Sequence, residues 1–321
     1  MINKTLVEEF LLLGFQVDHH YRVLLFIFFL ALYILTILGN LLIIVLVCTY
    51  RKLQSPMYIF MSNLSLADII FSTNIVPNML VITLKERPTI CVNECIAQFF
   101  FYGMLGSTEC FLLTVMSYDR YLAICNPLKY TYIMDFKLQQ ILLAVSWVTS
   151  ATVTLLPVVL LHRLYFCGPS VIDHFFCDLD PILDLSCSDT GIVKVETFIS
   201  SIYVVLLPFL VVISSYVRIL LTILKIPSTE SRQKTFSTCS THLLVVCTYF
   251  LTIITVYSNP SKTYSSNAQK VRSLLYTVLT PLFNPVIYAL RNKEIKNAIS
   301  CLMIQFISVI NYQDKTPNSI K

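Results

Sequence analysis

The clearest pattern in the chain is a series of long apolar runs separated by short polar segments. A helix needs roughly 20 apolar residues to cross about 30 Å of hydrocarbon, and seven of the runs satisfy this requirement. These runs cover 23–48, 58–84, 95–125, 141–161, 197–224, 236–257 and 273–290. Strands of a membrane barrel would be about half as long and would alternate polar with apolar residues. The pattern therefore predicts an all-α fold, a bundle of seven transmembrane helices.

The segment after the last run has a different periodicity. Apolar residues recur there at the spacing of one helical face, at Ile295, Ala298, Ile299 and Leu302. Lysines interspersed with such a face are typical of a short amphipathic helix that lies on a membrane surface. We therefore expect three parts: an extracellular N-terminus at 1–22, a seven-helix domain at 23–290, and a cytoplasmic surface helix and tail at 291–321.

Composition and charge agree with a membrane location and give its direction. Hydrophobic residues make up 56% of the chain and charged residues only 13%, where a soluble domain carries about 25% charged residues. Lys and Arg are retained on the cytoplasmic side of short loops. With the N-terminus outside, the inner segments hold most of the 23 Lys and Arg residues, and the outer segments are slightly acidic. This asymmetry explains the net charge without a nucleic-acid partner, so we expect membrane lipid and no nucleic acid.

The N-terminal segment lacks the basic start and apolar stretch of a signal peptide, since Glu8 and Glu9 lie where that stretch would be. We therefore expect the first apolar run to insert the chain. The triplet that begins at Asn3 is a glycosylation sequon and would then face the outside.

Two carboxylates lie deep within the predicted spans, where ionisable groups are costly and suggest function. They are Asp68 and Glu109, and Glu109 precedes Arg120 by about three helical turns, so both point to one side of the third helix. Together with Asn40 and Asn284, the carboxylates could form a buried cluster that holds a sodium ion. The alternative is a set of hydrogen bonds between helices without an ion. An ion-coupled transporter or channel is a second alternative, but the repeated halves typical of transporters are absent from the sequence.

The sequence gives no support for an enzyme. It contains no nucleophile motif, phosphate loop or cofactor fingerprint, and His242, among apolar neighbours, is interpreted as structural. The long loop before the fifth run contains Cys167, Cys177 and Cys187. His174 near Cys177 could indicate a metal site, but a closed zinc site needs four ligands, and the outer compartment favours disulfides. We expect no cofactor apart from the possible sodium ion.

Ordered motifs mark the ends of the predicted spans. They are Gly39-Asn40, Leu53-Gln-Ser-Pro-Met-Tyr58, Met116-Ser-Tyr-Asp-Arg-Tyr-Leu-Ala-Ile-Cys125, Ser215-Tyr216, Lys234-Thr-Phe-Ser-Thr-Cys-Ser-Thr-His-Leu243 and Pro281-Leu-Phe-Asn-Pro-Val-Ile-Tyr288. In order and position they resemble the motifs of odorant receptors, a branch of the rhodopsin-like G-protein-coupled receptors. Two departures are Gln54, where the family usually has His, and Tyr249-Phe250-Leu251, where it usually has Phe-Tyr-Gly.

The resemblance implies a function in olfaction and sensory transduction at the plasma membrane. The chain would bind a small, mostly apolar odorant within the helix bundle and activate a heterotrimeric G protein, in olfactory neurons a stimulatory one. The residues implied in coupling to the G protein are Asp119, Arg120, Tyr121, Tyr216 and Lys234.

The resemblance also implies the outer architecture. Disulfides would join Cys95 to Cys177 and Cys167 to Cys187, leave Cys91 unpaired, and hold the long loop as a lid over the bundle. The implied pocket residues are Tyr102, Gly103, Gly106, Ser107, Ser200, Val204, Ile253, Tyr257 and Thr277. The alternative is that most of these pack the core and a few polar groups orient a ligand. Because the set contains no Lys or Arg, we expect neutral ligands rather than carboxylic acids.

Overall fold

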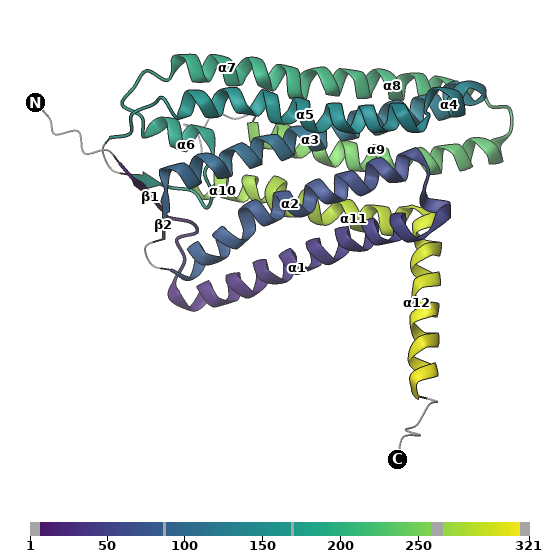
Figure 1. The fold of residues 1–321 in the computed structure, drawn as a ribbon, viewed down its shortest axis with the longest axis horizontal. Coiled ribbons are helices and arrows are strands. Elements are labelled where there is room, and N and C mark those ends of the chain that lie inside the picture. Colours follow the sequence, from purple (N-terminus) through teal and green to yellow (C-terminus); the bar gives the residue numbers. More distant parts are fainter. Residues whose placement is uncertain (1–6, 86–87, 168–169, 258–265, 315–321) are drawn as a thin grey trace, which may run out of the picture.

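The fold of the chain is a bundle of long helices, seen here in a computed structural model that describes residues 7–85, 88–167, 170–257 and 266–314. Within these ranges, seven helical segments run side by side (Figure 1). They are α1 (His19–Thr49), α2 (Pro56–Leu84), α3 (Val92–Cys125), α5 (Phe136–Leu161), α7 (Gly191–Ser201) continued through η2 (Ile202–Leu206) into α8 (Leu207–Leu224), α9 (Thr229–Tyr257), and α10 (Ser266–Leu274) continued through η3 (Leu275–Leu279) into α11 (Thr280–Arg291). Each predicted span falls within one of these segments, which confirms the predicted fold class.

The helices differ in how much of their apolar surface the protein itself covers. In the most apolar 18-residue stretch of α3, 61% is buried inside the protein, because this helix packs against α2, α5 and α8. In the corresponding stretch of α1, only 28% is buried. Six segments in the described part are long and apolar enough to span a membrane, and α9 has a shorter apolar stretch at Cys239–Thr255. The polar start of α9, around Glu230 and Arg232, therefore extends beyond the apolar zone.

Three short strands form a sheet at one end of the bundle, called the outer end after the predicted topology (Figure 1). The central strand β1 (Glu9–Leu12) pairs antiparallel with β2 (Thr89–Cys91) and parallel with β3 (Val171–Ile172). Gly14 follows with φ of +55°, and a Cβ at this position would meet Ile82 of α2 at 2.5 Å, so the turn requires glycine. The short helix α6 (Leu179–Asp184) lies at the same end.

The inner end carries three further elements, η1 (Arg51–Leu53), α4 (Pro127–Ile133) and α12 (Lys293–Asp314). Helix α12 turns away from the long axis of the bundle (Figure 1). The side chain of Asn292 starts it, because its carbonyl oxygen accepts the backbone N–H groups of Glu294 at 3.0 Å and Ile295 at 3.2 Å. The prediction of a short helix within 291–303 is wrong in length, since no Gly or Pro interrupts the chain before Asp314.

Candidate functional site

An aromatic cluster occupies the outer half of the bundle, where the predicted pocket lies. The ring of Tyr102 on α3 lies 5.6 Å from that of Phe71, 5.1 Å from that of Phe176 and 6.0 Å from that of Tyr276, measured between centroids. These four residues come from α2, α3, the long outer loop and η3. The loop therefore contributes a side chain to the interior, and Tyr102 lies where the resemblance implies a ligand contact.

Gly106 lies at the floor of this cluster, where three helices approach closely. The hydroxyl of Tyr249 on α9 donates to the carbonyl oxygen of Gly106 at 2.6 Å. A Cβ at position 106 would overlap the hydroxyl oxygen of Tyr276. Tyr249 is one of the residues that depart from the usual family pattern, and it connects α9 to α3 at this level.

Two π-helical turns shape the same region. Val204 lies in η2 and Thr277 lies in η3. Both turns end two residues before a proline, Pro208 or Pro281, and proline has no N–H to donate, so the turn before it must rearrange its hydrogen bonds. Such bulges occur frequently at functional sites. The prolines were the available sequence signal for these turns.

Other implied pocket residues make different contacts. Gly103 faces α5, since a Cβ there would meet Cγ2 of Thr154 at 2.7 Å. Ser107 donates to the carbonyl oxygen of Gly103 at 2.7 Å, and Ser200 donates to a carboxylate oxygen of Glu196 at 2.6 Å.

Ile253 is buried, and the side chain of Tyr257 lies outside the described residues. A cavity of about 400 Å³ lies elsewhere, between the link from β1 to α1 and the outer end of α2, and none of the implied pocket residues lines it.

The long outer loop is anchored at two cysteine pairs. Cys95 is bonded to Cys177 and Cys167 to Cys187, with Cα–Cα distances of 5.4 Å and 5.9 Å, the same pairs that the resemblance implies. Cys91 is a free, exposed thiol. The bond between Cys95 and Cys177 thereby fixes the loop to the first turn of α3. The predicted glycosylation site, Asn3, lies outside the described residues.

A buried polar cluster lies deeper in the bundle. Asn284 donates to both carboxylate oxygens of Asp68, at 3.2 Å and 2.9 Å, and Asn40 donates to the carbonyl oxygen of Pro281 at 2.9 Å. The carboxyl group of Glu109 contacts that of Asp68, and no other hydrogen-bond donor of the described residues reaches it. The cluster therefore joins α1, α2, α3 and α11, and it has unsatisfied oxygen atoms.

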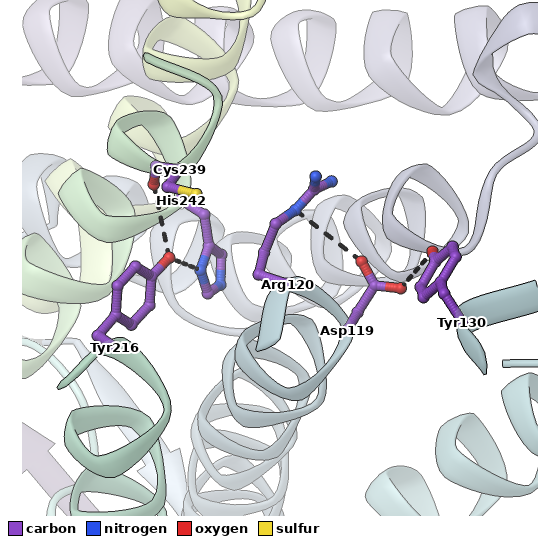
Figure 2. Close-up of polar contacts among 6 residues, drawn as sticks. All are labelled: Asp119, Arg120, Tyr130, Tyr216, Cys239 and His242. Carbon is purple, nitrogen blue, oxygen red and sulfur yellow. Dashed lines mark hydrogen bonds and ion pairs between the residues drawn. The ribbon is translucent and has the colours of Figure 1, made fainter. Parts of the chain in front are cut away.

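The inner end of α3 carries the implied coupling residues (Figure 2). Nε of Arg120 lies 3.9 Å from a carboxylate oxygen of Asp119, a loose ion pair. The other oxygen of Asp119 accepts a hydrogen bond from the hydroxyl of Tyr130 at 2.8 Å. Burial, together with the nearby Asp119, raises the pKa of Tyr130 above its usual value, so this phenol keeps its proton and donates. Tyr130 lies on α4 and was missed in the sequence.

A second contact lies beside Arg120 and joins α8 to α9 (Figure 2). The hydroxyl of Tyr216 lies 2.6 Å from Nδ1 of His242 and 3.5 Å from the carbonyl oxygen of Cys239. The interpretation of His242 as a structural residue fits this contact, which satisfies one of its ring nitrogens inside the bundle. The sequence does not show that its side chain turns toward Tyr216.

Two further coupling residues are less informative. Tyr121 stacks on Tyr118 with ring centroids 6.5 Å apart. Lys234 lies on α9, but its side chain lies outside the described residues.

The chain is similar to known proteins over nearly its whole length. The family model described as olfactory receptor matches residues 29–306. Human olfactory receptor 11L1 is 46% identical over 301 residues, which covers 94% of each chain, and rat olfactory receptor 1500 is 44% identical over 297 residues, 92% of this chain and 95% of its own. The crystal structure of squid rhodopsin superposes with a TM-score of 0.72 at 18% identity, covering 92% of this chain and 89% of that one, which shows the fold. The chain belongs to the olfactory receptor family and is a multi-pass membrane receptor, not an enzyme.

Proposed function

We propose that this receptor binds a small, mostly apolar odorant among its outer helix ends and activates a heterotrimeric G protein of the stimulatory, olfactory type. It would act in the plasma membrane with its N-terminus outside. The observation that carries the proposal is that α3 bears both sites, the aromatic cluster at Tyr102 and the loosely paired Arg120. Eighteen residues of helix, about 27 Å, separate them. A change at one end of this helix can therefore reach the other end.

The aromatic cluster suits an apolar ligand. Tyr102, Phe176 and Tyr276 are all buried and present ring faces and edges to one another. An odorant that inserts among these rings would replace some of their contacts with one another. Burial of its apolar surface would favour binding by about 25 cal/mol per Å² removed from water. Gly106 and Tyr249 lie below, so a ligand that moves Tyr276 would disturb the link between α3 and α9.

The inner end provides the response to this disturbance. The bond between Tyr216 and His242 holds α9 against α8, and the ion pair with Asp119 holds Arg120. Outward movement of α9 would separate His242 from Tyr216 and open a cleft. Arg120 would then turn toward Tyr216 and contact the C-terminal helix of the G-protein α subunit. The ligand drives this change only by binding the open state more tightly.

The direct test is to express the receptor in cells and to apply a panel of odorants. We expect some members to raise cyclic AMP, and we expect this response to disappear in cells that lack the stimulatory α subunit. A response that persists without the G protein, through an ion current for example, would favour the transporter or channel alternative. Cells without the receptor provide the background.

The buried polar cluster is proposed as a sodium site. Oxygen ligands suit a hard cation, and Asn40 and Glu109 carry buried oxygen atoms without hydrogen-bond donors in the described part of the chain. The carboxylate of Asp68, held by Asn284, would contribute a second negative charge. Sodium would then stabilise the conformation in which α2, α3 and α11 are close together. The alternative remains a network of hydrogen bonds without an ion.

Replacement of Glu109 with Gln tests the sodium site. Purified wild-type receptor should melt at a higher temperature in sodium chloride than in choline chloride of equal ionic strength, since sodium at ten times its Kd contributes about 1.4 kcal/mol. The Glu109→Gln variant should lose this difference while keeping its fold, and its signalling should become less sensitive to sodium. Glu196→Gln, on α7, is the control. An equal effect of sodium on wild type and Glu109→Gln would leave only the structural role.

A further inference from the structure

A buried lysine lies at the outer end of the seventh helical segment. The side chain of Lys270 on α10 is only 1% exposed, and its ammonium group forms an ion pair with a carboxylate oxygen of Asp173 at 2.5 Å. Asp173 belongs to the long outer loop, and its side chain is 46% exposed. The cation is therefore fixed inside the protein, while the anion can reach water.

Lys270 lies on the face of its helix that points to the ligand site. Ser273 follows Lys270 by three residues, Thr277 follows Ser273 by four, and all three are buried. Residues at these spacings lie on one helical face. Thr277 is an implied pocket residue about 10 Å along the axis from Lys270, and its neighbour Tyr276 belongs to the aromatic cluster. The ammonium group of Lys270 therefore lies next to the apolar ligand site.

His174 adds a second polar group to the same place. Its Nε2 lies 3.3 Å from the hydroxyl oxygen of Ser273, and its Nδ1 is buried without a hydrogen-bond partner among the described residues. Burial and the positive charge of Lys270 lower the pKa of His174 to about 3, so the ring is neutral. If Nε2 accepts a hydrogen bond from the hydroxyl group of Ser273, Nδ1 carries the ring hydrogen and can donate a hydrogen bond to an incoming acceptor.

We propose that Lys270, His174 and Ser273 form an anion subsite of the ligand pocket, selective for aliphatic carboxylic acids, in which Asp173 is an exchangeable occupant. An acid would place its carboxylate on the ammonium group and its chain toward Thr277 and Tyr276. A buried cation must keep a partner, because an unpaired one is strongly destabilising. Asp173 meets this need in the absence of ligand and can leave toward water. The sequence-based expectation of neutral ligands rested on a set of pocket residues that did not include Lys270. With Lys270 in the pocket, carboxylic acids become the expected ligands.

The subsite rests on the proposed ligand site but is tested by binding alone. Purified receptor would be melted with straight-chain acids, from butanoic to decanoic, and with the alcohols of equal chain length. We expect wild type to be stabilised more by acids than by alcohols. Asp173→Asn should bind acids about tenfold more tightly, since their internal competitor is gone, with alcohols unchanged. Lys270→Gln should lose the preference for acids.

Two further variants test whether the charge at position 270 sets the preference. Lys194→Gln removes an exposed lysine of α7 and should behave as wild type. The double variant Lys270→Asp with Asp173→Lys reverses the pair and should prefer straight-chain amines, which keeps the test decisive if Lys270→Gln fails to fold.

The outcomes separate the subsite from a simple latch and from the proposed function. If Asp173→Asn strengthens acids and alcohols equally, the ion pair only closes the loop, and the subsite is refuted. An unchanged acid shift in Lys270→Gln refutes it too. If acids bind as expected but no compound raises cyclic AMP in cells, the subsite stands and the proposed G-protein function fails.

Discussion

Replacing Cys177 with Ser is expected to remove the receptor from the cell surface and to abolish its response. The bond to Cys95 fixes the long loop to α3, and loss of a native disulfide typically costs about 2 to 5 kcal/mol. The backbone N–H of Cys177 also donates to the side chain of Gln98 at 2.9 Å, and Gln98 in turn bonds the backbone of Asn74 on α2 at 3.0 Å. The variant therefore loosens α2, α3 and the loop together.

Two matched variants show whether this pair is special. Cys91→Ser removes an exposed, free thiol one helical turn from Cys95 and should reach the surface normally. Cys167→Ser opens the bond to Cys187, which closes a shorter stretch of chain, so a smaller loss is expected. Surface receptor is measured by antibody staining of intact cells, and the response by cyclic AMP. A normal odorant response from Cys177→Ser would show that the loop needs no such anchor.

The helices could be predicted from sequence, but the outer sheet could not. Seven apolar runs fix the number and approximate limits of the spans, because the bilayer demands length and hydrophobicity from each helix separately. Strand β3 has only two residues, and β1 has four. Each strand depends on partners far away in the chain, such as Leu11 with Val171, and no local periodicity reveals such pairs.

Some functional residues could likewise be predicted from sequence motifs, and others could not. Asp119 and Arg120 belong to a motif that the sequence shows directly, whereas Tyr130 and His242 act through partners on other elements. The position of Gly103 was implied by family resemblance, but which side of a helix faces a pocket depends on its rotation, and Gly103 faces α5. A charged residue such as Lys270 in an outer segment gave no sign that it would be buried.

Asp119→Asn is expected to raise basal signalling. The carboxylate of Asp119 holds Arg120 at 3.9 Å and accepts a hydrogen bond from Tyr130 at 2.8 Å. An amide keeps the shape of this side chain but removes its charge, so Arg120 is freed. Tyr130→Phe removes only the supporting bond and should raise basal signalling less. Cyclic AMP without odorant, normalised to surface receptor, measures both effects, and equal basal levels in all three receptors would contradict the role of Asp119.

Arg120→Ala is expected to reach the surface, bind odorant and fail to signal. The side chain of Arg120 is 15% exposed and lies at the inner end of α3, between Asp119 and the contact of Tyr216 with His242 (Figure 2). A hydrogen bond to a charged group contributes about 1.5 to 3 kcal/mol, so affinity for the G protein should fall by about tenfold to a hundredfold. Odorant binding should persist, since the ligand site lies about 27 Å away along the helix.

The matched control for this variant is Arg218→Ala, which removes an exposed arginine from α8. If Arg120 were only one of the basic residues that orient the chain in the membrane, the two variants would behave alike, with correct insertion and normal signalling. Surface staining, ligand-induced melting shifts and cyclic AMP measured on the same preparations separate the possibilities. Full G-protein activation by Arg120→Ala at normal surface levels would overturn the coupling mechanism, because no other step gives this arginine a role once the chain is inserted.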